Sequence, residues 1–315
     1  MAWVTWRQHR AQLYAGLALL VGLAATALAT HLPIHAAYHR DAVAGCLPPS
    51  ARAGCDLIVR HFESEFGGWA AAARGLAVLP ALVGLFVGAP LLARELEHGT
   101  HRFAWTQAVT RRRWLLSKTA FIALGTVAAA SVASALTMWW RSPFDTLEGR
   151  MTPRGFDIEG LVVPAYALFA LALGVLAGLV LRRTVAAMSV TLIVFAATRL
   201  AVLKFLRPHF LAALHRTVVA TDSGRGVGDW VLSDTLVDAG GQNITAGRED
   251  LAILHAQQAG IDPHEYLVTL GWRRTISYQP EGRFWTFQLI EAGIFVLLAL
   301  AVIAAAVWFV RRTPA

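Results

Sequence analysis

The sequence predicts an all-α integral membrane protein with six transmembrane helices and both termini in the cytoplasm. Its 315 residues are 56% hydrophobic and 15% charged, and their mean hydropathy of +0.52 is too high for an ordinary soluble domain. The apolar residues occur in blocks of roughly twenty, the length that a helix needs to cross a bilayer core. We therefore expect a multi-pass protein of the plasma membrane.

A basic cluster sets the expected orientation of the helices. Arg111, Arg112 and Arg113 come just before an apolar run that begins near Lys118, and basic residues resist translocation across the membrane. This loop is therefore expected in the cytoplasm. The formal net charge of +8 then lies mainly on cytoplasmic segments and reflects attraction to anionic membrane lipids, so nucleic acid is not an expected partner.

The chain divides into four expected parts. Residues 1–12 predict an amphipathic segment on the inner membrane surface, with a frayed tail as the alternative. Residues 13–203 hold spans one to five and the cytoplasmic loop 93–118, residues 204–287 form an extracytoplasmic segment, and residues 288–315 hold the sixth span and a cytoplasmic tail. The predicted spans are Leu13–Leu32, Leu76–Leu92, Thr119–Trp140, Leu161–Leu181, Val185–Leu203 and Leu289–Val310.

Two of these spans carry pairs of glycines four residues apart. The second span contains Gly84 and Gly88, and the fourth contains Gly174 and Gly178. This spacing lets another helix approach closely. The glycines could form a dimer interface or pack two helices of the same subunit.

The segment from His35 to Arg74 is expected outside the cell and contains the only cysteines, Cys46 and Cys55. Two cysteines nine positions apart on the oxidising side of a membrane can close a small loop, so a disulfide is expected, with free thiols as the alternative.

Three histidines precede these cysteines. His31, His35 and His39 would align on a single helix, but Pro33 is expected to disturb that helix. We therefore expect polar residues at the membrane interface rather than a metal site.

The extracytoplasmic segment 204–287 is expected to be mainly helical. One helix is predicted from Ala246 to Ala259, ending at Gly260, and a second begins after the N-cap residue Asp262 and stops at Gly271. Between Thr221 and Gly241, glycines and aspartates suggest a flexible excursion.

The fifth span contains a charged residue, Arg199, which is costly in a hydrocarbon environment. A place in the transport path, together with Glu291, is one interpretation. The alternatives are that its long side chain reaches the lipid headgroups or forms a structural pair with Glu291.

The sequence lacks the motifs of common catalytic sites. A phosphate-binding loop of the GxxxxGK[ST] kind needs a lysine after glycine, whereas the only lysines, Lys118 and Lys204, follow serine and leucine. No HExxH or GxSxG motif is present. We expect neither an enzyme nor a cofactor bound by this chain.

The loop after the second span contains Glu95, Glu97, Gly99 and Thr100, followed by the run Thr106–Lys118. In these residues it resembles the corresponding loop of ABC-2 type exporter permeases. A second similarity opens the last span, at Tyr278–Pro280, Arg283–Trp285, Phe287 and Glu291.

The resemblance implies a function and its partners. Two permease subunits, as a homodimer, would assemble with two copies of a separate ATPase that binds ATP and Mg. A hydrophobic or amphipathic drug, antibiotic or lipid would be exported. Arg111, Arg112, Arg113 and Lys118 would anchor the third span at lipid phosphates. The ATPase would act on a coupling region that comprises Arg94, Glu95, Glu97, His98, Gly99, Thr100 and Arg102.

Two alternatives to transport remain open at the level of sequence. The chain could be a membrane-anchored sensor or immunity protein that binds ligands through its outer segments and transports nothing. A membrane-embedded enzyme using scattered residues such as His31, Asp41 and Arg199 is a third interpretation, although no coherent set of catalytic roles supports it.

Overall fold

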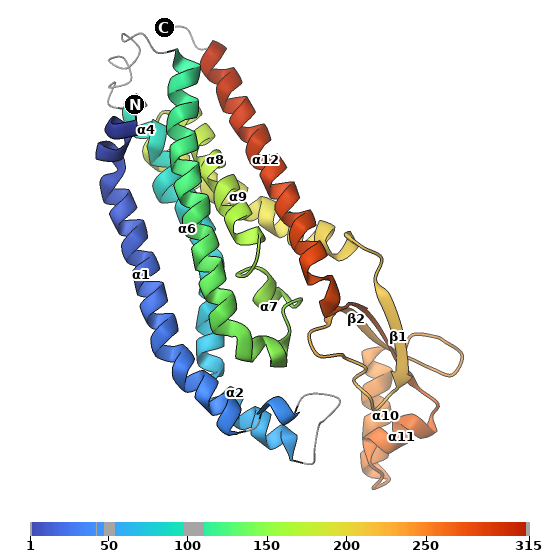
Figure 1. Ribbon diagram of the computed structural model, residues 1–315. Coiled ribbons are helices and arrows are strands. Elements are labelled where there is room, and N and C mark those ends of the chain that lie inside the picture. Colours follow the sequence, from blue (N-terminus) through green and yellow to red (C-terminus); the bar gives the residue numbers. More distant parts are fainter. Residues whose placement is uncertain (1, 42, 47–53, 98–109, 313–315) are drawn as a thin grey trace.

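The computed structural model describes residues 2–41, 43–46, 54–97 and 110–312. Six helices in these ranges are long and apolar enough to cross a membrane. The first, α1 (Ala2–Arg40), begins at the same end of the bundle where the last, α12 (Phe284–Arg312), finishes (Figure 1). We call this the terminal end and the opposite one the distal end.

The second span is a nearly continuous helix whose helical type changes along its length. It consists of α2 (Cys55–Ala73), a 3-10 turn (Arg74–Val78), α3 (Leu79–Val83), a π turn (Gly84–Gly88) and α4 (Ala89–Glu97).

The remaining spans are more regular. They are α6 (Arg111–Glu148), α8 (Val162–Leu181) and α9 (Thr184–Ala201), which continues through a π turn (Val202–Leu206) and a 3-10 turn (Arg207–His209). Two shorter elements lie at the distal end, namely a 3-10 turn (Val43–Cys46) and α7 (Pro153–Phe156).

The predicted outer segment from His35 to Arg74 is largely helical, because α1 extends to Arg40 and α2 starts at Cys55. Hydropathy finds only the part of a helix that crosses the lipid, and polar residues beyond it do not end the helix. The expectation that Pro33 disturbs the first helix is wrong, since α1 runs through it. Proline removes only one backbone hydrogen bond, and the neighbouring Ile34 and Ala37 are buried in packing contacts.

The fourth span, α8, is the centre of the bundle. It packs against α3, α4, α6, α9 and α12, and 78% of its most apolar window is buried, against 17–44% for the other spans. A helix that is apolar all round is suited to this position. The element that organises the membrane part is therefore α8.

The glycine pairs of the second and fourth spans pack against each other within this subunit. A Cβ atom on Gly174 would lie 2.5 Å from the carbonyl oxygen of Gly84, and one on Gly178 would lie 2.6 Å from that of Ala89. The π turn at Gly84–Gly88 lies in this crossing. Close approach of two backbones explains the glycines, so these faces are not available as a dimer interface.

The first span, α1, lies at the edge of the bundle (Figure 1). It packs against α6 and, near the distal end, against α2. Ile34, Phe62, Trp140 and Phe144 form the centre of this contact. The structure also joins Cys46 to Cys55 in a disulfide, with the two Cα atoms 5.2 Å apart, which closes the distal end of α1 and α2.

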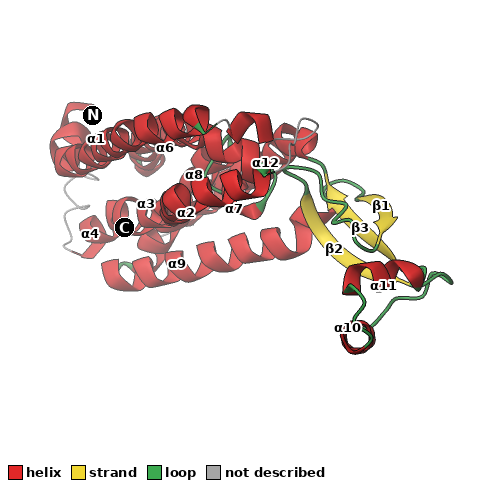
Figure 2. Cartoon of the chain, turned by 90° about the horizontal axis from the view of Figure 1, so that it is seen from below, coloured by secondary structure: helices red, strands yellow, loops and turns green. Residues whose placement is uncertain are grey.

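The segment between the fifth and sixth spans contains a three-stranded antiparallel sheet (Figure 2). Its strands β1 (Leu214–Val219), β3 (Arg273–Gln279) and β2 (Trp230–Val237) are ordered β1-β3-β2. The expectation of a mainly helical segment is therefore corrected, and β2 occupies the predicted flexible excursion. The strands are short, and their pairing partners are distant in sequence, so local patterns did not reveal them.

The two helices predicted in this segment are confirmed. They are α10 (Ala246–Gln258) and α11 (Pro263–Thr269). Both end before glycines with positive φ, Gly260 at +67° and Gly271 at +69°. They pack on the sheet through a small core of Ala220, Leu236, Ala252, Leu267 and Trp272.

Candidate functional site

At the terminal end, an ion pair joins the second span to the third. The ammonium group of Lys118, in the second turn of α6, donates a hydrogen bond to the carboxylate of Glu95 on α4. The Lys118 side chain is only 5% exposed and that of Glu95 is 21% exposed. This burial corrects the expectation that Lys118 anchors the third span at lipid phosphates, because its charge is paired inside the subunit.

A second contact joins the second span to the fifth. The Oε2 atom of Glu97 accepts hydrogen bonds from the backbone N–H of Thr184, at 3.2 Å, and from its hydroxyl group, at 2.8 Å. Thr184 is the first residue of α9, where backbone N–H groups lack helical partners and a negative charge is stabilising. Glu97 thus caps α9.

The turn that brings Thr184 to Glu97 is short. Arg182 has a left-handed conformation with φ of 54°, and Arg183 is extended. The N–H group of Arg182 donates to the carbonyl oxygen of Gly178, which ends α8. These two arginines therefore reverse the chain between α8 and α9 beside the end of α4, which packs against both helices.

The other predicted coupling and anchoring residues occupy different positions. Arg94 is exposed near the end of α4, and Arg112 and Arg113 are exposed in the first turn of α6. Arg111 begins α6, whose N-terminus is capped by the Thr110 hydroxyl oxygen. His98, Gly99, Thr100 and Arg102 lie outside the described residues.

At the distal end, a cluster of charged residues surrounds Glu291 of α12. Arg207 donates from Nε to Oε2 of Glu291 and from a terminal nitrogen to Oε1, both at 2.7 Å. The same guanidinium group lies 2.6 Å from Oδ1 of Asp157, and the Tyr166 hydroxyl donates to Glu291 at 2.5 Å. We call Asp157, Tyr166, Arg199, Arg207 and Glu291 the Glu291 cluster.

Arg199 belongs to this cluster but does not pair with Glu291, as one interpretation of the sequence expected. Its guanidinium carbon lies 3.6 Å from the centre of the Tyr166 ring, and a terminal nitrogen lies 3.2 Å from Oδ2 of Asp157. A cation stacked on an aromatic face is favourable when desolvated. The partner of Glu291 is Arg207, which sequence reasoning missed because it assigned this residue to an outer segment.

A second cluster lies at the distal end of α6. Arg141 is fully buried, and its Nε atom lies 2.7 Å from Oε1 of Glu159 and 3.3 Å from Oδ1 of Asp145. Arg150 lies 3.1 Å from Asp145, and Glu148 lies 3.7 Å from Arg141. We call these five residues the Glu159 cluster. Sequence reasoning missed them, since it ended the third span at Trp140 and began the fourth at Leu161, which left these residues in the connection between them.

The loop of residues 149–161 contributes Asp157 to one cluster and Glu159 to the other. Gln288 of α12 holds it, accepting from the N–H of Val162 and donating to the carbonyl oxygen of Phe156, both at 3.0 Å. The Ser134 hydroxyl donates to the carbonyl oxygen of Gly160 at 2.9 Å. Gly160 has φ of +72°, and a Cβ atom there would lie 2.6 Å from Gln288, so glycine is required.

Burial changes the acidity of Glu159, which lies between the third and fourth spans. Desolvation, followed by repulsion from the Asp145 carboxylate, raises the pKa of Glu159 to about 8. Within the part of the chain that the structure describes, its Oε2 atom is buried and accepts no hydrogen bond. At neutral pH this carboxyl group is therefore largely protonated.

The row of histidines on α1 is aligned, because the helix continues through Pro33. The Nε2 atoms of His35 and His39 lie 3.3 Å apart, and His31 stacks on Trp139 with 3.9 Å between ring centres. Among the described residues, no three His, Cys, Asp or Glu side chains are placed to hold a metal ion.

Comparison with known proteins places the chain in a family. A family model described as "ABC-2 membrane transporter related" matches residues 17–207, which is more than half of the chain. No curated protein and no solved structure matches. The matched part includes spans one to five and the loop between α4 and α6. The chain belongs to the ABC-2 membrane transporter related family and is a multi-pass permease, the membrane component of an ABC transporter that works with a partner ATPase.

Proposed function

We propose that this permease exports a hydrophobic or amphipathic compound, such as a drug, antibiotic or lipid, across the plasma membrane. Two copies of the chain form a homodimer, and two copies of a separate ATPase bind ATP and Mg and drive transport through the loop after the second span. The observation that carries this proposal is the pair of contacts made by Glu95 and Glu97 where that loop begins.

These contacts distribute a force applied at the loop over several spans. Displacement of the end of α4 acts directly on the second span. The Glu95–Lys118 pair transmits it to α6, and the Glu97 cap transmits it to α9. The glycine crossing holds the second span against α8. A movement at the loop therefore shifts spans two to five together and changes access to the substrate path.

The predicted coupling residues then divide into two groups. Glu95 and Glu97 act within the subunit and stiffen the base of the loop. Arg94, His98, Gly99, Thr100 and Arg102 are the residues that we propose contact the ATPase. Arg111, Arg112 and Arg113 hold the start of α6 at anionic lipid headgroups, which basic side chains at a membrane surface favour.

The proposal is tested by Glu95→Lys in the permease–ATPase complex reconstituted in vesicles. This substitution places two ammonium groups together where one is buried, so we expect at least a tenfold loss of export and of transport-dependent ATPase activity. The exchange Glu95→Lys with Lys118→Glu restores opposite charges and should recover much of the loss. The control is Asp250→Lys, an equal charge change at an exposed position on α10.

Unchanged export and ATPase activity in a folded Glu95→Lys complex would contradict the coupling role. Purification of the tagged chain tests the wider proposal, because an exporter permease should carry a stoichiometric ATPase. A chain that is recovered alone, without nucleotide-dependent activity, would favour a sensor or immunity protein instead.

A further inference from the structure

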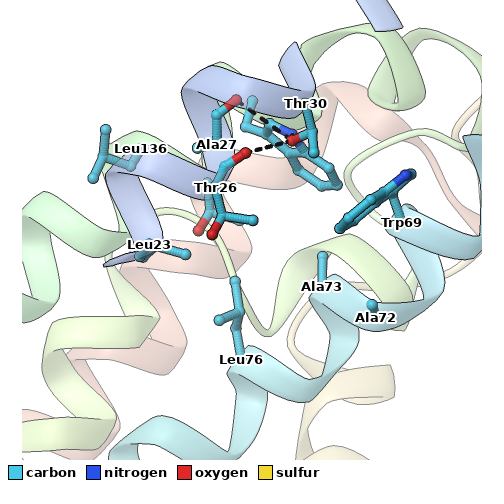
Figure 3. Close-up of a pocket in the computed structure, with 11 residues that line it drawn as sticks. Leu23, Thr26, Ala27, Thr30, Trp69, Ala72, Ala73, Leu76 and Leu136 are labelled. Carbon is cyan, nitrogen blue, oxygen red and sulfur yellow. Dashed lines mark hydrogen bonds between the residues drawn. The ribbon is translucent and has the colours of Figure 1, made fainter. Parts of the chain in front are cut away.

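A cavity of about 180 Å³ lies between three spans in the distal half of the bundle (Figure 3). The helix α1 contributes Leu23 and Thr30 to its wall, the second span contributes Trp69 and Leu76, and α6 contributes Leu136 and Trp140. The lining residues of α1 and α6 lie in the distal parts of the apolar stretches Leu13–Leu32 and Thr119–Trp140, and Leu76 begins the stretch Leu76–Leu92. The cavity therefore lies at the distal boundary of the bilayer core.

The polar groups of the wall are already used inside the protein. The Thr30 hydroxyl donates to the carbonyl oxygen of Thr26 at 2.7 Å, and the Trp140 indole N–H donates to the Thr30 oxygen at 2.7 Å. The hydroxyls of Thr26 and Thr137 donate to the carbonyl oxygens of Gly22 and Ala133. These side chains can therefore contact an occupant only through their carbon atoms, and the site suits an apolar group.

The cavity exists because small side chains line it where the second span changes pitch. Ala72 and Ala73 end α2 immediately before the 3-10 turn of Arg74–Val78, and they line the cavity on the side of the second span (Figure 3). Trp69 is 46% exposed, although it contributes to the wall. The mouth therefore opens on the outer surface of the bundle, which contacts lipid.

We propose that this pocket binds the apolar part of the transported amphiphile late in export, before it leaves sideways into the distal half of the bilayer between α1 and the second span. This inference rests on the export function proposed above and assigns a substrate site to it. An apolar cavity of about 150 Å³ holds a benzene-sized molecule. The pocket thus holds one ring or a short hydrocarbon stretch of the substrate, while the polar part stays outside.

The attachment of α1 agrees with this route. Its main packing in the described chain is with α6 and, near the distal end, with α2, through the aromatic contact of Phe62, Trp140 and Phe144. The rest of its length carries exposed apolar residues such as Leu17, Leu19 and Leu28. A guest between α1 and the second span therefore displaces lipid and leaves the packing of α8 unchanged.

Photolabelling tests binding. The complete permease–ATPase complex is placed in lipid nanodiscs with a small aromatic diazirine dissolved in the bilayer, and adducts are located by mass spectrometry. We expect adducts on the segment Trp69–Leu76. Ala73→Phe fills the cavity and should reduce this labelling at least fivefold. Ala71→Phe, two residues earlier on the exposed face of the same helix, is the matched control and should leave it unchanged.

A second variant with the opposite expected effect on labelling distinguishes a filled pocket from a misfolded protein. Leu136→Ala enlarges the cavity and should increase labelling of Trp69–Leu76. Labelling that is equal in the wild type, Ala73→Phe and Leu136→Ala would overturn the proposed pocket. The Glu95→Lys result would stand in that case, since it does not depend on where the substrate binds.

Export measured on the same variants tests whether the pocket serves transport. Ala73→Phe should reduce export at least fivefold without dissociating the ATPase, and Ala71→Phe should not. Loss of labelling with normal export would overturn the assignment of the pocket to the substrate route while leaving the exporter intact. If a chain that binds no ATPase and exports nothing is still labelled normally, the export function itself is refuted. The molecule in the pocket is then not a transported substrate.

Discussion

The Glu291 and Glu159 clusters lie on either side of the same loop but differ in their balance of charge. In the Glu291 cluster, Arg199 and Arg207 face two carboxylates. In the Glu159 cluster, Arg141 and Arg150 face three. With every arginine and carboxylate ionised, the first cluster is therefore neutral, whereas the second carries one excess negative charge.

This difference shows two ways to keep ions in a protein interior. A buried ion pair is stable when its geometry is good and its remaining hydrogen-bonding atoms are satisfied. The bidentate contact of Arg207 with Glu291 meets the geometric part of that requirement, although the third nitrogen of Arg207 has no hydrogen-bond partner among the described residues. The second cluster instead removes its excess charge by holding a proton on Glu159, whose pKa is raised to about 8. We expect the first cluster to be insensitive to pH and the second to respond to it.

The largest loss of stability is expected in the Glu291 cluster, where positive and negative charges balance. Arg207→Met leaves the buried Glu291 without its main partner and leaves Asp157, which is partly exposed, with Arg199 alone. Removing one partner of a buried pair costs about 3–5 kcal/mol, so the variant should unfold at a much lower temperature in detergent. Adding Glu291→Gln should restore part of the stability. A melting temperature equal to the wild type would show that the pair is not an integral part of the fold.

Removing the corresponding arginine from the other cluster should cost less. Arg141→Met leaves an excess of negative charge, but Glu159 can stay protonated, so at pH 7 we expect a loss smaller than the roughly 3–5 kcal/mol of a broken buried pair. The stabilities of the two variants should respond differently to acidification. Lowering the pH to about 5.5 should recover stability for Arg141→Met and little for Arg207→Met. Equal recovery in both would remove the distinction between the clusters.

The pH dependence of the wild type follows from Glu159. Its pKa is raised from 4.5 in the unfolded chain to about 8 in the fold, so between these values the folded protein binds more protons than the unfolded one. Stability should therefore fall as pH rises through this window, by at most about 1.4 kcal/mol per pH unit. Thermal unfolding between pH 5 and 9 measures this slope. Glu159→Gln should flatten it, and a slope that persists would assign the titration to another group.

The smallest effect on stability is expected for Glu148, at the partly exposed edge of the Glu159 cluster. Glu148 lies 3.7 Å from Arg141, and its side chain is 28% exposed. A partly exposed pair contributes about 0–1 kcal/mol, so Glu148→Gln should barely change the melting temperature or its pH dependence. A change as large as that of Glu159→Gln would mean that the excess charge is shared over the whole cluster.

The sequence predicted the membrane architecture well because hydropathy and basic flanks are local signals. The fourth span was expected at Leu161–Leu181 and is found at Val162–Leu181. The helices α10 and α11 were predicted from caps and glycines, which are also local. The lengths of α1 and α2 were missed because apolar composition marks only the part of a helix that meets lipid.

The clusters could not be predicted because their members are far apart in the chain. Arg207 meets Glu291 across 84 positions, and nothing near either residue reveals the other. The sequence did single out Arg199 and Glu291 as unusual, and both lie in one cluster. The capping of α9 by Glu97 depends equally on tertiary structure, since 87 positions separate Glu97 from Thr184.

The long-range contacts of α12 have a consequence for the order in which the chain is made. A ribosome completes Arg207 and the 149–161 loop well before it reaches Gln288 and Glu291. Until the last span is inserted, Arg199 and Arg207 share the single carboxylate of Asp157, and the 149–161 loop lacks its hydrogen bonds to Gln288. The sixth span therefore completes the charge balance of the permease interior, and a chain interrupted before it carries an excess positive charge at this site.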